Sequence, residues 1–286
     1  MCTQRTPLRD SDRGSEPPIL RVHNLEVYYG SGRIDQLRLL DGVHCEIKAG
    51  EIVGLLGESG AGKTTLAKAI LGLLPRPGYS VHGSITFDGT PLLALKQHEM
   101  RAIRGARVSL VHQDSSVLNP VMRVGDQIVE VLRAHRDCSS QQYRESALSL
   151  LQDLEVVDPE RVYRAYPHQL SGGQRQRIAI AQALACEPVL VIADEPTSCL
   201  DARTSTQVLR LLARLKWSRR TAVLLISHDC SVLAEISDRL MVMYEGRIVE
   251  QGAPAELLQA PRHPYTCALL ECRQRLQMMG PRYPGR

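Results

Sequence analysis

The chain has 286 residues, enough for one large domain or two small ones with an ample core. Hydrophobic residues make up 43% of the chain and charged residues 23%, as is typical of a globular protein. The 35 Lys and Arg against 31 Asp and Glu leave a net charge of +4, too small to indicate a nucleic-acid partner. No apolar run approaches the roughly 18–20 residues that a membrane-spanning helix needs.

Residues 1–17 form a polar opening stretch, rich in Arg, Ser and Pro, without the apolar core of a signal peptide. We expect a disordered leader on a cytoplasmic protein. The eight cysteines are scattered and contain no C-x-x-C pair, and Cys267 and Cys272 are the closest together. Reduced and mostly buried thiols are therefore expected.

Two strand candidates, Ile19–Tyr29 and Leu39–Ile47, precede the first strong motif and favour an early antiparallel sheet. The first candidate ends in Tyr28 and Tyr29, although only 4% of the chain is aromatic. Packing within an ordinary strand and a functional role explain the presence of either tyrosine equally well. The functional alternative is that Tyr29 stacks on the adenine ring of a nucleotide.

Gly57–Thr64 matches G-x-x-x-x-G-K-[ST], the pattern of a phosphate-binding loop (P-loop). A buried-strand candidate, Ile52–Leu56, precedes it and a helix candidate, Leu66–Leu71, follows it, which is the context such a loop requires. The glycines let backbone N–H groups turn toward a phosphate, and the helix N-terminus adds the positive end of its dipole. We expect Lys63 to reach the β- and γ-phosphates and Thr64 to ligate Mg²⁺.

The middle of the chain changes from strands to helices. Ser84–Gly89 predicts a strand and a turn, and Arg107–Asp114 predicts an apolar strand that ends in polar side chains. Gln113 at the end of that strand could reach a metal or a water, although a solvated loop glutamine is the simpler interpretation. Apolar residues at helical spacing over Val124–Leu154 indicate an inserted helical subdomain at about 115–170.

A second glycine motif, Leu170–Gln174, opens a helix expected over Gln174–Cys186. Alone, Ser171 and its glycines indicate a helix N-cap, although such a helix start can also bind an anion. The following strand is apolar enough to be buried on both faces, and Asp194 and Glu195 stand at its carboxyl end. An Asp there suits Mg²⁺, and a Glu beside it suits orienting or deprotonating a water.

The last third repeats the strand–helix alternation. Asp201 leads into a helix, and Thr221–Ile226 is another buried strand with His228 beyond its end. A lone histidine at a strand end is more often structural than catalytic. A hairpin with a two-residue turn at Glu245-Gly246 follows, then a short helix near Glu256. Residues 271–286 are expected to be a polar tail.

In this order, the motifs resemble those of the ATP-binding cassette (ABC) ATPases, over roughly Ile19–Leu270. The resemblance implies an α/β fold: a RecA-like P-loop NTPase core with an N-terminal antiparallel β-subdomain and an inserted α-helical subdomain. The ATPase domain would then span residues 18–270. One departure is Cys199, where a small Ala is usual.

The resemblance also implies a role for each motif. Glu195 is the general base, His228 contacts the γ-phosphate, and Gln113 completes the shell of the metal and the attacking water. Thr64, Gln113 and Asp194 are the implied Mg²⁺ ligands. Tyr29 is preferred to Tyr28 for stacking on adenine, because the aromatic usually precedes the glycine. The residues implied to contact ATP are Tyr29, Gly57, Glu58, Ser59, Gly60, Ala61, Gly62, Lys63, Thr64, Thr65, Ser171, Gly172, Gly173, Gln174 and Asp201.

Members of this family bind two ATP molecules between two cassettes arranged head to tail. The resemblance therefore implies a second cassette chain, identical or different, with Ser171–Gln174 closing on the partner's ATP. Three stretches are similar to importers of dipeptides, oligopeptides and nickel: residues 111–120, 166–169 and, most tellingly, His263–Thr266 with Ala268–Leu270. Many relatives carry an iron–sulfur cluster beyond this point, but Cys267 and Cys272 alone do not predict one.

The implied function is the ATPase subunit of an importer, peripheral to the cytoplasmic face of the membrane. Separate permease subunits and, indirectly, an extracytoplasmic substrate-binding protein would complete it. A soluble cassette ATPase is the first alternative, but such proteins usually carry two cassettes or long insertions. A P-loop kinase is the second, but it would not need Ser171–Gln174 with Asp201.

Overall fold

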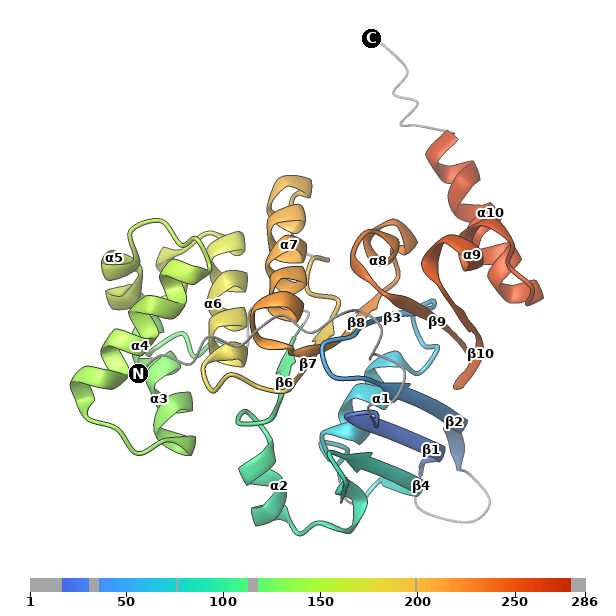
Figure 1. Ribbon diagram of the computed structural model, residues 1–286, viewed down its shortest axis with the longest axis horizontal. Coiled ribbons are helices and arrows are strands. Elements are labelled where there is room, and N and C mark those ends of the chain that lie inside the picture. The colour runs from blue at the N-terminus through green and yellow to red at the C-terminus, as the bar shows by residue number, and fades with distance from the viewer. Residues whose placement is uncertain (1–16, 31–35, 76, 113–117, 199, 279–286) are drawn as a thin grey trace.

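The structure is a computed structural model, and it describes residues 17–30, 36–75, 77–112, 118–198 and 200–278. Two sheets and a group of helices make up this part of the chain (Figure 1). The predicted leader apart from Pro17, as well as Gln113 and Cys199, lies outside the described residues.

The smaller sheet is the predicted antiparallel β-subdomain. Its order is β2-β1-β4-β5, and each neighbouring pair is antiparallel. Its strands are β1 (Leu20–Tyr29), β2 (Leu37–Ile47), β4 (Tyr79–Phe87) and β5 (Thr90–Pro91). A 3₁₀ turn, η2 (Leu92–Ala94), and helix α2 (Gln97–Ile103) lead from it back to the core.

The larger sheet is the core, ordered β10-β9-β3-β8-β7-β6. All neighbours are parallel except the edge strand β10, which pairs antiparallel with β9. The strands are β3 (Ile52–Leu56), β6 (Val108–Val111), β7 (Leu190–Asp194), β8 (Ala222–Ser227), β9 (Arg239–Tyr244) and β10 (Arg247–Gly252). The predicted hairpin turn is confirmed: Glu245 and Gly246 both have positive φ, as a two-residue turn of this type requires.

The central strands are buried on both faces, because successive side chains point to opposite sides of the sheet. Val53 and Leu55 of β3 face a hydrophobic cluster shared with the small sheet and with helix α1 (Lys63–Ile70). Ile52 and Leu56 face the opposite cluster, which is shared with helices on the other side. The apolar runs in the sequence are continuous because both faces of this sheet are covered.

The remaining helices include the inserted subdomain, which lies at the end of the molecule away from the small sheet (Figure 1). Its helices are α3 (Val124–His135), α4 (Ser140–Asp153) and α5 (Pro159–Arg164). A 3₁₀ turn, η4 (Pro167–Gln169), leads into the helices that pack on the core, α6 (Gly172–Leu184), α7 (Ala202–Arg219), α8 (Cys230–Ile236), α9 (Pro254–Gln259) and α10 (Pro264–Met278). The α/β fold with its β-subdomain and helical insertion is as the sequence predicts.

The start of helix α6 and the presence of helix α10 differ from the sequence prediction. Helix α6 begins at Gly172 rather than Gln174, because Ser171 and Gln174 form a reciprocal capping box that starts the helix directly after Ser171. Helix α10 was not predicted, and it continues to Met278, through the start of the expected polar tail. Leu269 and Leu270 of this helix are buried, so this part of α10 packs on the core.

Candidate functional site

The loop between β3 and α1 needs glycine at two places for reasons visible in the backbone. A Cβ on Gly57 would lie 2.5 Å from the carbonyl oxygen of Met243, and real Cβ atoms do not approach so closely. Gly62 has φ of 106°, and a Cβ there would lie 2.8 Å from Cδ2 of Leu40. Neighbouring segments of the chain thus hold the loop tightly at both ends, and its shape is preformed.

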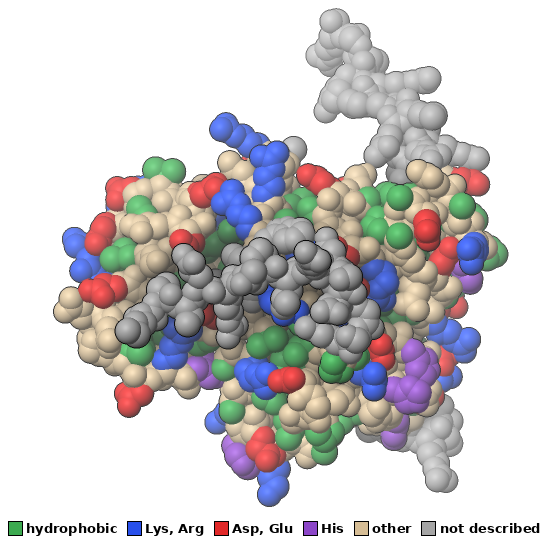
Figure 2. Space-filling view, viewed as in Figure 1, with side chains coloured by type: hydrophobic (Ala, Val, Ile, Leu, Met, Phe, Trp, Pro, Cys, Tyr) green, Lys and Arg blue, Asp and Glu red, His purple; other side chains and the backbone are tan. Residues whose placement is uncertain are grey.

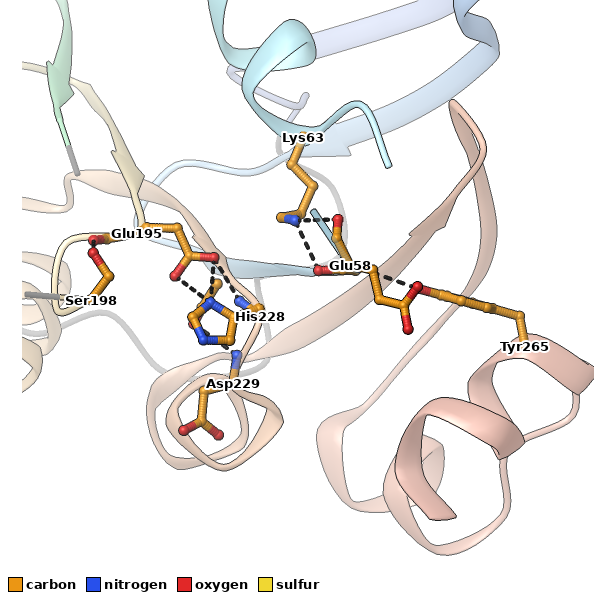
Figure 3. Close-up of polar contacts among 9 residues, drawn as sticks. Glu58, Lys63, Glu195, Ser198, His228, Asp229 and Tyr265 are labelled. Carbon is orange, nitrogen blue, oxygen red and sulfur yellow. Dashed lines mark hydrogen bonds and ion pairs between the residues drawn. The ribbon is translucent and has the colours of Figure 1, made fainter. Parts of the chain in front are cut away.

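Lys63 is the first residue of α1 and is only 7% exposed. Its ammonium group donates hydrogen bonds to the carbonyl oxygens of Gly57 and Glu58, both at 2.8 Å (Figure 3). Burial lowers the pKa of Lys63, and the nearby carboxylates of Glu195 and Asp194 oppose that shift. The loop therefore holds a partly desolvated cation, and because an ammonium has three N–H donors, it can gain a phosphate partner while keeping its two carbonyl partners.

Asp194 ends β7 and is 9% exposed. Burial raises the pKa of its carboxyl group, and a hydrogen bond from Thr64 opposes that shift. A buried carboxylate beside a hydroxyl offers the hard oxygen ligands that Mg²⁺ prefers. The described residues contain no group of three or more metal-binding side chains, so Mg²⁺ here would depend on phosphate oxygens and water as well, which is its usual mode of binding.

Glu195 follows Asp194 and has a left-handed backbone, with φ of 49°. Its carboxylate accepts a 2.8 Å hydrogen bond from the backbone N–H of His228 and lies 2.8 and 2.9 Å from Nδ1 of the same residue. The Glu195 side chain is 13% exposed, whereas that of His228 is 59% exposed. The pair brings an acid–base candidate and an exposed imidazole to the same edge of the sheet as Lys63.

These side chains share a cavity of about 860 Å³. Its lining comes from the P-loop, from strand β2, from the ends of β7 and β8, and from the β9–β10 turn. The lining residues are Leu37, Arg38, Leu39, Asp41, Ser59, Gly60, Gly62, Lys63, Thr64, Thr65, Asp194, Glu195, His228, Glu245 and Gly246. The volume and the cation suit a nucleotide with its phosphates on the P-loop.

Tyr29 does not line this cavity. It is 50% exposed at the end of β1, and its ring packs at a tilt against Tyr79, with centroids 5.0 Å apart. The residues that follow it, 31–35, lie outside the described part. Stacking of Tyr29 on adenine therefore stays a prediction.

The Ser171–Gln174 motif lies elsewhere, in a hollow of about 290 Å³ that shares no lining residue with the first cavity. Oγ of Ser171 accepts a 3.3 Å hydrogen bond from the Gln174 N–H, and Oε1 of Gln174 accepts a 3.1 Å bond from the Ser171 N–H. Gly172 has no atom within 4 Å of where a Cβ would stand, so this face is open. The chain by itself therefore carries its two glycine motifs at separate places.

Asp201 caps the N-terminus of α7 through Thr204. Its carboxylate accepts from the Thr204 N–H at 3.0 Å and from the Thr204 hydroxyl at 2.8 Å, and the backbone bond is the main cause of its lowered pKa. A Cβ on Gly173 would lie 2.8 Å from Cγ2 of Thr204. Thr204, which the sequence did not single out, thus connects the Asp201 cap to the Ser171–Gln174 motif.

The structure brings the P-loop, Asp194, Glu195 and His228 into one cavity, whose lining includes neither Ser171–Gln174 nor Asp201. Gln113 is outside the described residues. Sequence reasoning also missed a contact from the C-terminal part of the chain, where Tyr265 reaches the P-loop residue Glu58 (Figure 3). The signal was the His263–Thr266 stretch, which had no assigned role.

A P-loop with a buried lysine, facing two carboxylates at the carboxyl edge of a mostly parallel sheet, defines a nucleoside-triphosphate hydrolase of the P-loop class. The chain belongs to the ABC transporter family, whose model matches residues 40–198. No helix in the described part is both long and apolar enough to span a bilayer.

Relatives and solved structures agree with this assignment. A probable D,D-dipeptide transport ATP-binding protein of Escherichia coli is 43% identical over 89% of this chain and 78% of its own length. An oligopeptide transport ATP-binding protein of Bacillus subtilis is 40% identical over 92% of this chain and 74% of its own. A dimeric ATP-binding cassette, solved in a post-hydrolysis state with ADP and phosphate, has a TM-score of 0.74 and 29% identity, covering 82% of this chain and 98% of the other. The chain is an ABC ATPase that binds and hydrolyses ATP.

Proposed function

We propose that this chain is the ATP-hydrolysing subunit of an ABC importer that takes up a small solute through separate permease chains. Peptides are the preferred cargo, with nickel or a related solute as alternatives. The named transport relatives, at about 40% identity over most of the chain, support the cargo class. An importer subunit of this kind would sit peripherally on the cytoplasmic face of the membrane and act indirectly with an extracytoplasmic binding protein.

The observation that carries the two-cassette part of the proposal is the separation of the two motif sites. The cavity with Lys63, Asp194 and Glu195 has no contribution from Ser171, which lies in its own open hollow. A second cassette, identical or different, placed head to tail would bring its own Ser171 motif to this chain's ATP. Each ATP would then lie between two chains, and hydrolysis would be coupled to their separation.

The residue roles follow from the chemistry of the cavity. The P-loop N–H groups and Lys63 would bind the β- and γ-phosphates, and Thr64 and Asp194 would hold Mg²⁺. When bound, Mg²⁺ neutralises charge on the phosphates during transfer. Glu195 would accept the proton of the attacking water, which requires its carboxylate to exchange at least one contact with His228 for that water.

Glu195→Gln tests the arrangement in the full chain. The substitution keeps the shape of the side chain but removes the base, and such losses cost roughly 10²–10⁴ in rate. With Lys63, Thr64 and Asp194 intact, the variant should bind ATP with Mg²⁺ and shift from monomer to dimer by light scattering, but not with ADP. Adding Ser171→Arg should prevent the shift while leaving ATP affinity unchanged, since Ser171 lies outside the ATP cavity.

The partner and the cargo need a second measurement. Purification of the tagged full chain from membranes should recover permease chains. Deletion of the gene that encodes this chain should abolish uptake of labelled dipeptides by the cells. If the Glu195→Gln chain binds ATP but stays monomeric even with the cassette encoded beside it, the two-chain site is wrong. Recovery of the chain without membrane partners would instead favour an ABC ATPase that is not coupled to transport.

A further inference from the structure

The stretch His263–Thr266 lies at the start of helix α10, and hydrogen bonds hold it to strand β10 of the core sheet. The carboxylate of Glu250, on β10, accepts hydrogen bonds from the backbone N–H groups of Arg262 at 2.8 Å and His263 at 3.1 Å. Nδ1 of His263 accepts from the Tyr265 N–H at 3.2 Å, and Thr266 is fully buried. These contacts fix the first turn of α10 and the direction in which Tyr265 leaves it.

Tyr265 spans the distance from α10 to the P-loop (Figure 3). Its ring stacks on Tyr244 at the end of β9, with centroids 4.2 Å apart and planes 29° apart. Its hydroxyl oxygen accepts a 3.1 Å hydrogen bond from the backbone N–H of Glu58, 207 residues earlier in the chain. Stacking on Tyr244 fixes the orientation of the Tyr265 ring, and this orientation places the Tyr265 hydroxyl against the P-loop.

The N–H of Glu58 and the C=O of Gly57 belong to one planar peptide group. The N–H end of this group donates to Tyr265, and the C=O end accepts from the Lys63 ammonium at 2.8 Å. Tyr265 therefore acts on the same rigid unit that positions the lysine. Turning this peptide about its flanking bonds would break both hydrogen bonds at once.

We propose that Tyr265 is a positioning residue for ATP binding, which acts by fixing the Gly57–Glu58 peptide and, through it, the P-loop and Lys63. Without the hydroxyl, the peptide can rotate and the loop samples shapes that do not bind phosphate. ATP must then select the competent fraction, so its affinity falls while the chemistry on bound ATP is unchanged. The inference rests on ATP binding at this cavity but not on the transport role.

The test compares two single-hydroxyl deletions in the full chain. Tyr265→Phe keeps the ring and its stack, and removes only the oxygen that meets Glu58. Tyr244→Phe removes the hydroxyl of the other ring in the same stack and serves as the matched control. Titration with Mg·ATP and with Mg·ADP should show about two- to tenfold weaker binding for Tyr265→Phe, the range expected for one neutral hydrogen bond.

Two further readouts separate positioning from general stability. The KM for ATP should rise by the same factor in Tyr265→Phe, with kcat at saturating ATP unchanged. Amide hydrogen exchange at Glu58 should become faster in Tyr265→Phe and stay at the wild-type rate in Tyr244→Phe. Wild-type affinity in Tyr265→Phe, or an equal loss of affinity in both variants, would overturn the proposal, because the hydroxyl contact would then have no effect of its own.

Discussion

Gly172→Ala and Gly173→Ala form a matched pair, because adjacent glycines of one motif meet different surroundings. A Cβ at position 172 meets open space, whereas a Cβ at position 173 would lie 2.8 Å from Cγ2 of Thr204. Both substitutions put alanine in the first turn of α6. Alanine in a helix is favoured over glycine by up to about 1 kcal/mol, so Gly172→Ala should leave the free energy of unfolding unchanged or raise it slightly.

Gly173→Ala should lose stability instead. Thr204 must move away, and insertion of a methyl group into a packed contact costs typically about 1–3 kcal/mol. The movement of Thr204 also weakens the two hydrogen bonds that Asp201 accepts from it, and loss of such an N-cap costs about 1 kcal/mol. We expect Gly173→Ala to unfold with a free energy about 1–3 kcal/mol below that of Gly172→Ala.

Urea unfolding of the purified chain, followed by circular dichroism, measures this difference. Thr204→Ser removes the clashing methyl group but keeps the hydroxyl that bonds to Asp201, so it should restore most of the deficit in the Gly173→Ala background and none in the Gly172→Ala background. Equal unfolding midpoints for the two alanine variants would refute the reasoning. So would a Gly173→Ala deficit that Thr204→Ser leaves in place.

Two more predictions concern chemistry. Lys63→Ala removes the buried cation aimed at the phosphates, and ATPase activity, measured as phosphate release by folded protein, should fall by at least about 10²–10³-fold. Near wild-type turnover would show that Lys63 does not stabilise the phosphates. Anaerobically purified chain should contain no stoichiometric iron or sulfide and show no absorbance from a cluster, because Cys267 and Cys272 alone cannot supply the four thiolates that a cluster needs; stoichiometric iron would mean that another chain shares the ligands.

The parts of the fold that the sequence predicts best are those in which burial or close packing constrains several consecutive residues. Strands β3, β7 and β8 are covered on both faces, so their residues are apolar except for the polar residues at the carboxyl ends of β7 and β8, Asp194 and Ser227, and the apolar run itself is diagnostic. The P-loop is similar, because contacts as close as 2.5 Å at Gly57 exclude any side chain. Such constraints act within a few residues and can be read from the chain alone.

Contacts between distant elements were not predictable in the same way. Whether Tyr265 reaches Glu58 depends on where α9 and the turn after it place the start of α10, which no local pattern encodes. The contact of Gly173 with Thr204 depends likewise on how α6 packs on α7. The position of Tyr29 shows the same limit, since a residue at a strand end can turn toward a neighbouring ring or toward the cavity.

Sheet order explains why the P-loop, Glu195 and His228 line one cavity of a single chain. Strands β7, β8 and β3 are parallel neighbours, so their carboxyl ends lie at one edge. The segments that follow them deliver Glu195, His228 and the P-loop to one cavity, although they are far apart in sequence. The Ser171 motif starts a helix that packs beside this sheet, and Thr204 ties it to the cap of α7. A rearrangement that carried Ser171 into its own chain's cavity would have to break that packing, whereas a second chain can bring its Ser171 there without changing either fold.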